Sequence, residues 1–314
     1  MLSRRHIRVK VMQIVYAFNN LENVDMKLPQ KLLLQSMEDM YNLYLLLISL
    51  VAEVHSRAEN YLDKSKLKHL ATQQEKNPNK KFIDNKLLKQ VKLNTALQEV
   101  LKKRMPNDWK LDSEYVEIIF KRILESDIYR NYMESNQNSY QEDKKFVLDL
   151  YKIIIAPDEK LYDYLEDKKL TWLDDLPVVN TGIVKLLKKA TEKSPESYFL
   201  PLLYKDDEDR DFGIQLLNKT ILNQNKYSQE IADKTTNWDS DRIAKLDSIL
   251  LKMAICELQN FPSIPTKVTM NEYLEIAKEY STPKSSMFIN GILDRIVKEY
   301  GETGKLNKTG RGLM

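Results

Sequence analysis

Three arginines open the chain at a spacing that suits phosphate binding. Arg4, Arg5 and Arg8 all precede Glu22, the first acidic residue. If this stretch is helical, a step of 100° per residue brings Arg5 and Arg8 to one face. Positive charge at a helix N-terminus is disfavoured by the helix dipole, so the cluster needs compensation. RNA phosphates would supply it, whereas a frayed chain start would explain the same residues without a ligand.

The element that must position these arginines is a helix predicted over Arg4–Phe18. Its apolar residues follow the i, i+4, i+7, i+8, i+11 spacing of a core-facing side: Ile7, Val11, Ile14, Val15 and Phe18. A second helix is predicted over about Gln30–Lys64. The pattern from Phe82 to Phe199 is helical as well, with breaks expected at four prolines, Pro106, Pro157, Pro177 and Pro195.

The last third of the chain predicts three short helices that pack as an antiparallel bundle. The first covers Asp239–Asn260. The second opens at a Thr269/Glu272 capping box and runs to about Tyr280, and the third starts near Thr282 and stops at Gly301. With only seven glycines and ten prolines among 314 residues, the expected fold class is all-α.

The sequence carries little that would support catalysis. Neither the P-loop nor the dinucleotide-binding glycine pattern occurs, and His6, His55 and His69 are not at metal-ligand spacing. The single cysteine, Cys256, is expected to fill a core. We therefore expect no enzyme activity, no cofactor and no metal. The longest apolar stretch, Leu43–Ala52, is shorter than the ~20 residues of a membrane span, and no signal peptide is recognisable, so a cytoplasmic protein is expected.

Residues 66–105 are strongly basic, with eleven lysines or arginines against three acids. Such a density can attract a polyanion. It is also typical of a solvated, flexible loop, here centred on Asn77–Asn79. Both interpretations stay open from the sequence.

An internal repeat is predicted at a constant offset of 66 residues. The shift lays Phe146 on Phe212, Asp167-Lys168 on Asp233-Lys234, and Trp172 on Trp238. Residues 143–190 and 209–256 should then share one helix arrangement, with the two tryptophans in equivalent environments.

Residues near the two ends of the chain resemble the NusB family of transcription antitermination factors. The stretches that carry the resemblance are 264–272 (IPTKVTMNE), 276–278 (IAK) and 288–294 (FINGILD), together with Arg4, Arg5, Arg8, Gln13 and Tyr16. The length is similar to the enlarged form seen in Bacteroidetes-type bacteria. The resemblance divides the chain into 1–65, the N-terminal part of the NusB-like domain; 66–205, an inserted helical segment that the predicted repeat would make a duplication; 206–300, a C-terminal bundle; and 301–314, a flexible basic tail.

This resemblance implies a non-catalytic, all-helical protein that binds boxA-type single-stranded RNA together with the ribosomal protein NusE. It would act on the transcription elongation complex and support ribosomal RNA transcription; a homodimer is left open. Family positions carried over to this sequence give Arg4, Arg5, Arg8, Lys267 and Phe288 as RNA contacts, and Asp247 and Lys252 as partner contacts. By pattern alone Phe288 is more typical of a core, and as a base-stacking platform it should be exposed beside Lys267 and the first helix.

Two other function classes compete with the antitermination factor. One is a helical protein scaffold in which the N-terminal arginines are incidental. The other is an RNA-binding module working with a ribosomal RNA methyltransferase, because NusB-like modules front such enzymes. That alternative is weaker, since no Gly-rich cofactor turn follows the module in this chain.

Overall fold

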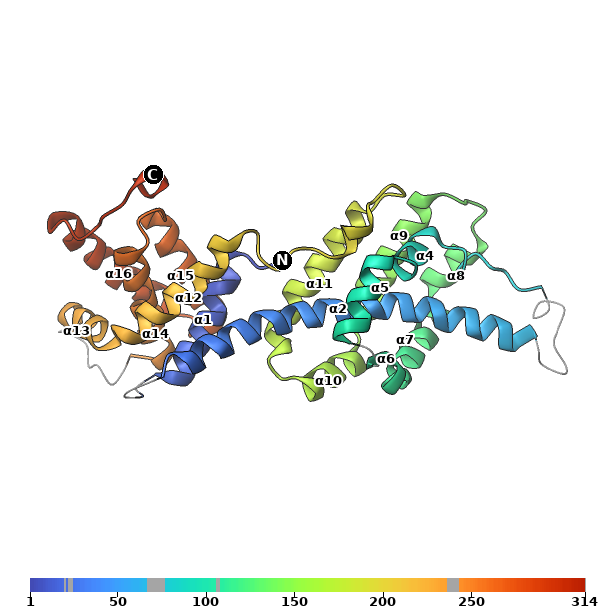
Figure 1. Ribbon diagram of the computed structural model, residues 1–314, viewed down its shortest axis with the longest axis horizontal. Helices are drawn as coiled ribbons and strands as arrows, with labels where there is room; N and C mark the ends of the chain where they lie inside the picture. The colour runs from blue at the N-terminus through green and yellow to red at the C-terminus, as the bar shows by residue number, and fades with distance from the viewer. Residues whose placement is uncertain (20, 22–24, 67–76, 106–107, 236–242, 314) are drawn as a thin grey trace. The chain divides into compact units, whose positions relative to one another are not determined.

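The computed structural model describes residues 1–19, 21, 25–66, 77–105, 108–235 and 243–313, and every regular element within these ranges is a helix (Figure 1). This agrees with the all-α expectation. No described helix combines the length and apolar character of a membrane span. The α-helices are α1 Arg4–Phe18, α2 Lys27–Lys66, α4 Lys86–Lys92, α5 Thr95–Arg104, α6 Asp108–Leu111, α7 Ser113–Glu125, α8 Asp127–Glu134, α9 Tyr140–Leu150, α10 Glu159–Lys168, α11 Trp172–Lys189, α12 Asp207–Leu222, α13 Gln224–Lys234, α14 Lys245–Asn260, α15 Thr266–Tyr280 and α16 Ser285–Glu302. A π-helical turn, Tyr151–Ile155, and two 3₁₀ turns, Glu196–Phe199 and Gly310–Leu313, complete the set.

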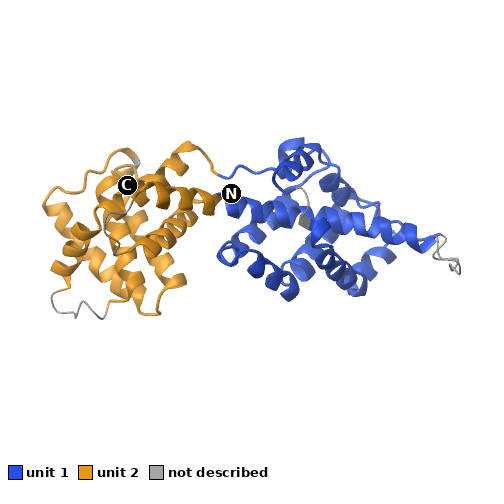
Figure 2. Cartoon of the chain, turned by 60° about the horizontal axis from the view of Figure 1, so that its bottom comes forward, with its two compact units in different colours: residues 1, 38–203 blue, residues 2–37, 204–314 orange. Residues whose placement is uncertain are grey.

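The chain forms two compact units (Figure 2). Unit 1 comprises Met1 and residues 38–203, and unit 2 comprises residues 2–37 and 204–314. This division differs from the predicted boundary at residue 65, because the 40-residue helix α2 begins in unit 2 and continues into unit 1.

The predicted helix boundaries are confirmed where both ends carry a local signal. Helix α1 begins and ends where expected, with Ser3 as its N-cap. Two local predictions were wrong. Pro177 lies inside α11, where it removes the bond to the carbonyl of Leu173 without ending the helix. Helix α15 already begins at Thr266, because Thr269 and Glu272 bond to other helices instead of capping their own.

Unit 2 is built around α14, whose residues Ile249–Leu258 are all buried. Cys256 is among them, so its predicted place in the core is confirmed, and burial raises the pKa of its thiol to about 11. Helices α1, α12, α15 and α16 each pack against α14. Helix α12 approaches α1 closely because Gly213 faces the fully buried Ile7. A Cβ at Gly213 would lie 2.8 Å from the Cγ2 methyl of Ile7.

Replacing Gly213 with valine is expected to lower the free energy of unfolding by about 1–3 kcal/mol, because the β-branched Ile7 cannot move away without disturbing α1. Gly291→Val is the matched control, since a Cβ at Gly291 meets nothing within 4 Å. Urea unfolding of both variants checks this prediction. Equal stabilities would show that α1 and α12 are not held in this close contact.

In unit 1 the described part of the basic stretch folds into α4 and α5 rather than a flexible loop. Much of its charge is paired, as in Lys86 with Glu192, Lys89 with Asp84 and Arg104 with Glu38. Asparagine side chains at Asn85 and Asn94 cap the two helices, which explains why the chain folds here despite its charge. Residues 67–76 lie outside the described part of the chain.

The helix boundaries agree with the predicted repeat over much of its length. When 66 is added to their residue numbers, the ends of the helical stretch 140–155 fall within one residue of the ends of α12. The ends of α10 likewise fall within one residue of the ends of α13. Asp143 and Asp209, which the shift superposes, are both buried in the first turn of their helix. Each accepts a hydrogen bond from the helix packed against it, from the Lys86 N–H and the Arg4 Nε–H respectively. Trp238 lies outside the described residues, so the equivalence of the two tryptophans stays a prediction.

Candidate nucleic-acid interface

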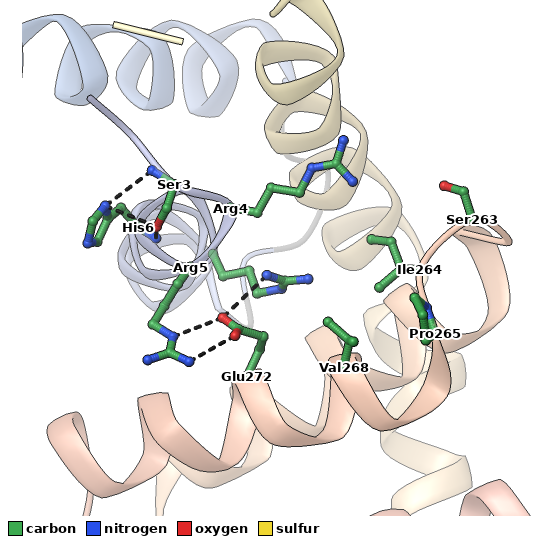
Figure 3. A pocket seen from close by; sticks show the side chains of 10 residues that line it. Ser3, Arg4, Arg5, His6, Ser263, Ile264, Pro265, Val268 and Glu272 are labelled. Carbon is green, nitrogen blue, oxygen red and sulfur yellow. Dashed lines mark hydrogen bonds and ion pairs between the residues drawn. The ribbon is translucent and has the colours of Figure 1, made fainter. Parts of the chain in front are cut away.

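The N-terminus of α1 forms one side of an open groove in unit 2 with a volume of about 630 Å³ (Figure 3). The opposite side is the loop Ser263–Pro265 and the first turns of α15. The lining combines basic, apolar and polar side chains with one acid: Ser3, Arg4, Arg5, His6, Arg8, Ser263, Ile264, Pro265, Val268 and Glu272. The sequence prediction found the arginines but missed the apolar side. The only local sequence signal for this apolar side is the i, i+4 spacing of Val268 and Glu272, which places both residues on one face of α15.

Arg8 is buried and does not present its charge to a ligand. Its guanidinium donates through Nε and Nη2 to the two carboxylate oxygens of Glu257, at 2.8 and 2.7 Å. The side chains are 2% and 0% exposed. Glu257 also accepts from the Thr269 hydroxyl at 2.8 Å and the Tyr273 hydroxyl at 3.2 Å. Burial disfavours the charge on Arg8, but Glu257 more than offsets this and the Arg8 pKa is raised. The predicted RNA contact by Arg8 is therefore wrong: this residue ties α1 to α14.

Arg4 and Arg5 are part-exposed at the rim of the groove, with 36% and 41% of their side chains accessible. Arg4 donates through Nε to Asp209 at 2.8 Å. Arg5 donates twice to Glu272, at 2.9 and 2.8 Å, as the paired dashed lines in Figure 3 show. The hydrogen bond from Arg5 lowers the pKa of Glu272. Acids of α12, α14 and α15 thus offset the unfavourable positive charge at the N-terminus of α1. A bound phosphate is not needed to account for the three arginines there.

His6 takes part in the N-terminal cap of α1. Its Nδ1 accepts the Ser3 N–H at 3.2 Å, while the Ser3 hydroxyl accepts the His6 N–H at 3.4 Å. This is a reciprocal capping box with histidine in place of the usual glutamate. Burial, followed by the charge of Arg5, lowers the pKa of His6. The imidazole is therefore held in the neutral form that can accept the cap hydrogen bond.

Acidification is expected to weaken this cap. Because the folded pKa of His6 is lowered, the neutral ring stabilises the fold above its ordinary pKa of about 6.5, and this contribution is lost as pH falls through the folded value. The loss should be about 1 kcal/mol, the size of a helix cap. Urea unfolding at pH 8 and pH 5 should show a smaller decrease for His6→Gln than for the wild-type chain. An equal decrease would place the acid sensitivity elsewhere, for example at His55.

The two remaining predicted RNA contacts do not line this groove. Lys267 is exposed in the first turn of α15, next to Val268. Phe288 is half-buried near the start of α16, whereas its neighbour Ile289 is fully buried. Helices α15 and α16 pack against each other and are joined by residues 281–284 alone, so they run antiparallel. At about 1.5 Å per residue, Lys267 lies roughly 20 Å along α15 from the connection between them, whereas Phe288 lies near that connection. Their joint contact with RNA stays a prediction.

The predicted partner contacts are buried as well. Asp247 is 5% exposed and accepts a hydrogen bond from the Ser281 hydroxyl at 2.6 Å. Lys252 is 6% exposed, and burial lowers the pKa of its ammonium group. Both predictions of a direct surface contact are wrong, because α14 is the central helix of unit 2 rather than an outer one. Among the described residues, no three His, Cys, Asp or Glu side chains are placed to hold a metal ion.

Comparison with known proteins gives a consistent result. The sequence model of the NusB family matches residues 182–298. The transcription antitermination protein NusB of Salinibacter ruber is 43% identical over 112 residues, which cover 36% of this chain and 70% of that protein. The protein of the same name in a Geobacter species is 37% identical, over 35% of this chain and 75% of its own length. In Chloroherpeton thalassium a further NusB is 42% identical over 35% of this chain and 52% of its own length. No solved structure shows a significant match.

The matched residues include nearly all of unit 2 beyond α1 and α2, and they contain the three helices whose acids pair with the arginines, α12, α14 and α15. Most of unit 1 lies outside them, in agreement with an enlarged chain. The chain therefore belongs to the NusB family.

Proposed function

We propose that the chain acts in transcription antitermination by binding single-stranded RNA of the boxA type at the groove in unit 2. The observation that carries this proposal is the pairing of two part-exposed arginines with an apolar wall across one open groove. The names of the NusB relatives support the antitermination role. No catalytic step is proposed.

The two sides of the groove suit different parts of a nucleotide. Pro265 and Val268, with the buried Ile264 beside them, offer an apolar surface on which an unpaired base can lie. A guanidinium has five N–H donors, and Arg5 uses two of them on Glu272. The remaining donors can bind a phosphate while the ion pair holds the side chain in place. Lys267, at the start of α15, would add a point charge at this rim.

A protein partner is favoured by a separate feature of unit 2. Leu28 and Leu32, one turn apart on α2, are 52% and 40% exposed, and Tyr16 on α1 is 46% exposed. Exposed apolar residues at i, i+4 spacing are typical of a helix face that binds another protein. We propose that the family partner, the ribosomal protein NusE, binds here rather than at Asp247 and Lys252, and that the pair then joins the elongation complex in the cytoplasm.

The test is RNA binding with and without purified NusE. NusE should tighten the complex between the wild-type chain and a boxA-type oligonucleotide, whereas Leu28→Ser/Leu32→Ser should bind RNA alone normally but lose this enhancement. A wild-type chain that binds NusE and no RNA would favour the scaffold alternative. Binding to neither would contradict the proposal.

A further inference from the structure

The C-terminal segment Thr303–Leu313 packs against the loop Phe261–Pro262 within unit 2, although a flexible tail was predicted here. The Thr309 N–H donates to the carbonyl of Pro262 at 3.0 Å, and Lys308 Nζ donates to the carbonyl of Phe261 at 3.2 Å. Gly304 and Gly310 have φ of 68° and 54°, a left-handed conformation that glycine adopts without strain. Gly312 lies so close to Pro262 that a Cβ would overlap the Pro262 carbonyl. The backbone of the segment thus lies in close contact with the loop at Phe261 and Pro262.

That loop also forms the wall of the candidate interface. A second hollow of about 850 Å³ lies beside the groove and shares Ser3, Arg4 and Ser263 with it. Thr309 and Gly310 of the C-terminal segment line this second hollow together with Lys205 and the three acids at the start of α12, Asp206, Glu208 and Asp209. A strand that leaves the groove past Arg4 would enter this hollow, where the acids of α12 repel its phosphates and the basic C-terminal segment attracts them.

Charge distinguishes the C-terminal segment from the groove. The groove arginines are matched by acids, since Arg4, Arg5 and Arg8 pair with Asp209, Glu272 and Glu257. Residues 303–313 instead contain three basic residues and no acid: Lys305, Lys308 and Arg311. Lys305 is exposed, and Lys308 is half-buried with a pKa lowered by burial. Affinity for RNA depends on positive charge that can replace counterions, and the C-terminal segment adds three cations to the two arginines at the rim of the groove.

We propose that the C-terminal segment Thr303–Leu313 is a second arm of the RNA-binding surface, which binds the phosphates of the strand where it leaves the groove. This inference rests on the proposed function. It assigns a role to a segment outside residues 182–298, the part matched by the family. The groove takes a base and its phosphate, and the arm adds cations for the phosphates beyond the groove.

The test measures RNA affinity as a function of salt for the full chain and for Lys305→Gln/Lys308→Gln/Arg311→Gln. The triple variant should bind about tenfold more weakly at low salt. Its log–log salt slope should be shallower by up to about 2, since each phosphate of a single strand that is no longer neutralised reduces the slope by about 0.7. Its melting temperature should change little, because Lys305 is exposed and Lys308 contributes one hydrogen bond, to the carbonyl of Phe261.

Gly312→Val separates the position of the arm from its charge. This variant keeps all three cations but forces the arm away from Pro262, so it too should bind RNA more weakly. Gly301→Val is the matched control, because a Cβ there meets nothing within 4 Å. Unchanged affinity and slope in the triple variant would overturn the inference. A chain that ends at Glu302 and binds RNA more tightly would also overturn it, because the arm would then block the groove. A wild-type chain that binds no RNA would instead contradict the proposed function itself.

Discussion

Replacing Arg8 with alanine is expected to lower the free energy of unfolding by about 3–5 kcal/mol, because Glu257 would keep its charge in the core without a cationic partner. The two hydroxyl groups that also donate to Glu257, from Thr269 and Tyr273, are too weak to compensate for a buried carboxylate. The substitution should therefore disturb α1, α14 and α15 together. Urea or thermal unfolding of the purified variant measures the effect.

Two further variants show whether the buried charge is the cause. Arg5→Ala removes a guanidinium of the same helix from a part-exposed ion pair, which is worth only about 0–1 kcal/mol. Arg8→Met/Glu257→Leu removes both buried charges and should cost less than Arg8→Ala alone. If Arg8→Ala and Arg5→Ala were equally stable, the Arg8–Glu257 pair would not hold α1 to α14.

Replacing Phe288 with alanine is expected to weaken RNA binding by about 1–3 kcal/mol, or roughly 5- to 150-fold, if its ring stacks on a base. Because the ring is half-buried, the variant should lose less stability than the ~3–5 kcal/mol typical of a fully buried phenylalanine. Titration with a boxA-type oligonucleotide and thermal unfolding, done on the same preparation, measure both quantities.

The neighbouring Ile289 provides the matched control, since it lies on the same helix and is fully buried. Ile289→Ala should lose about 2–5 kcal/mol of stability, while the molecules that remain folded bind RNA normally. A Phe288→Ala variant with the same behaviour would remove Phe288 from the RNA surface, and leave Arg4, Arg5, Lys267 and the C-terminal arm as the RNA contacts.

Local sequence signals were sufficient to predict much of the fold. Ser3 marks the start of α1, and the apolar spacing that follows marks its buried face, because both depend on residues close in the chain. Pro177 shows the limit of such signals. A proline is expected to end a helix, but at this position the packing of α11 outweighs one missing hydrogen bond.

The candidate site was harder to predict, because its arginines take partners far away in the sequence. Glu257 lies 249 residues from Arg8, and no local pattern indicates that the two are paired and buried. Family resemblance placed Asp247 and Lys252 on a helix, but it did not show that this helix is the centre of unit 2. The packing of the C-terminal arm against Pro262 was missed since glycine and lysine near a chain end are typical of a mobile tail.

The most direct test of RNA binding at the groove is the salt dependence of RNA affinity in a variant that lacks the charges of the two rim arginines. Arg4→Gln/Arg5→Gln should bind a boxA-type oligonucleotide more weakly than the wild-type chain between 50 and 200 mM salt. Its log–log slope should be shallower by about 1.4, or about 0.7 for each phosphate that the variant no longer neutralises. Arg130→Gln is the control, because it removes an exposed, ion-paired arginine from unit 1. If the rim variant and this control both match the wild-type chain in affinity and slope, RNA does not bind at the groove beside α1.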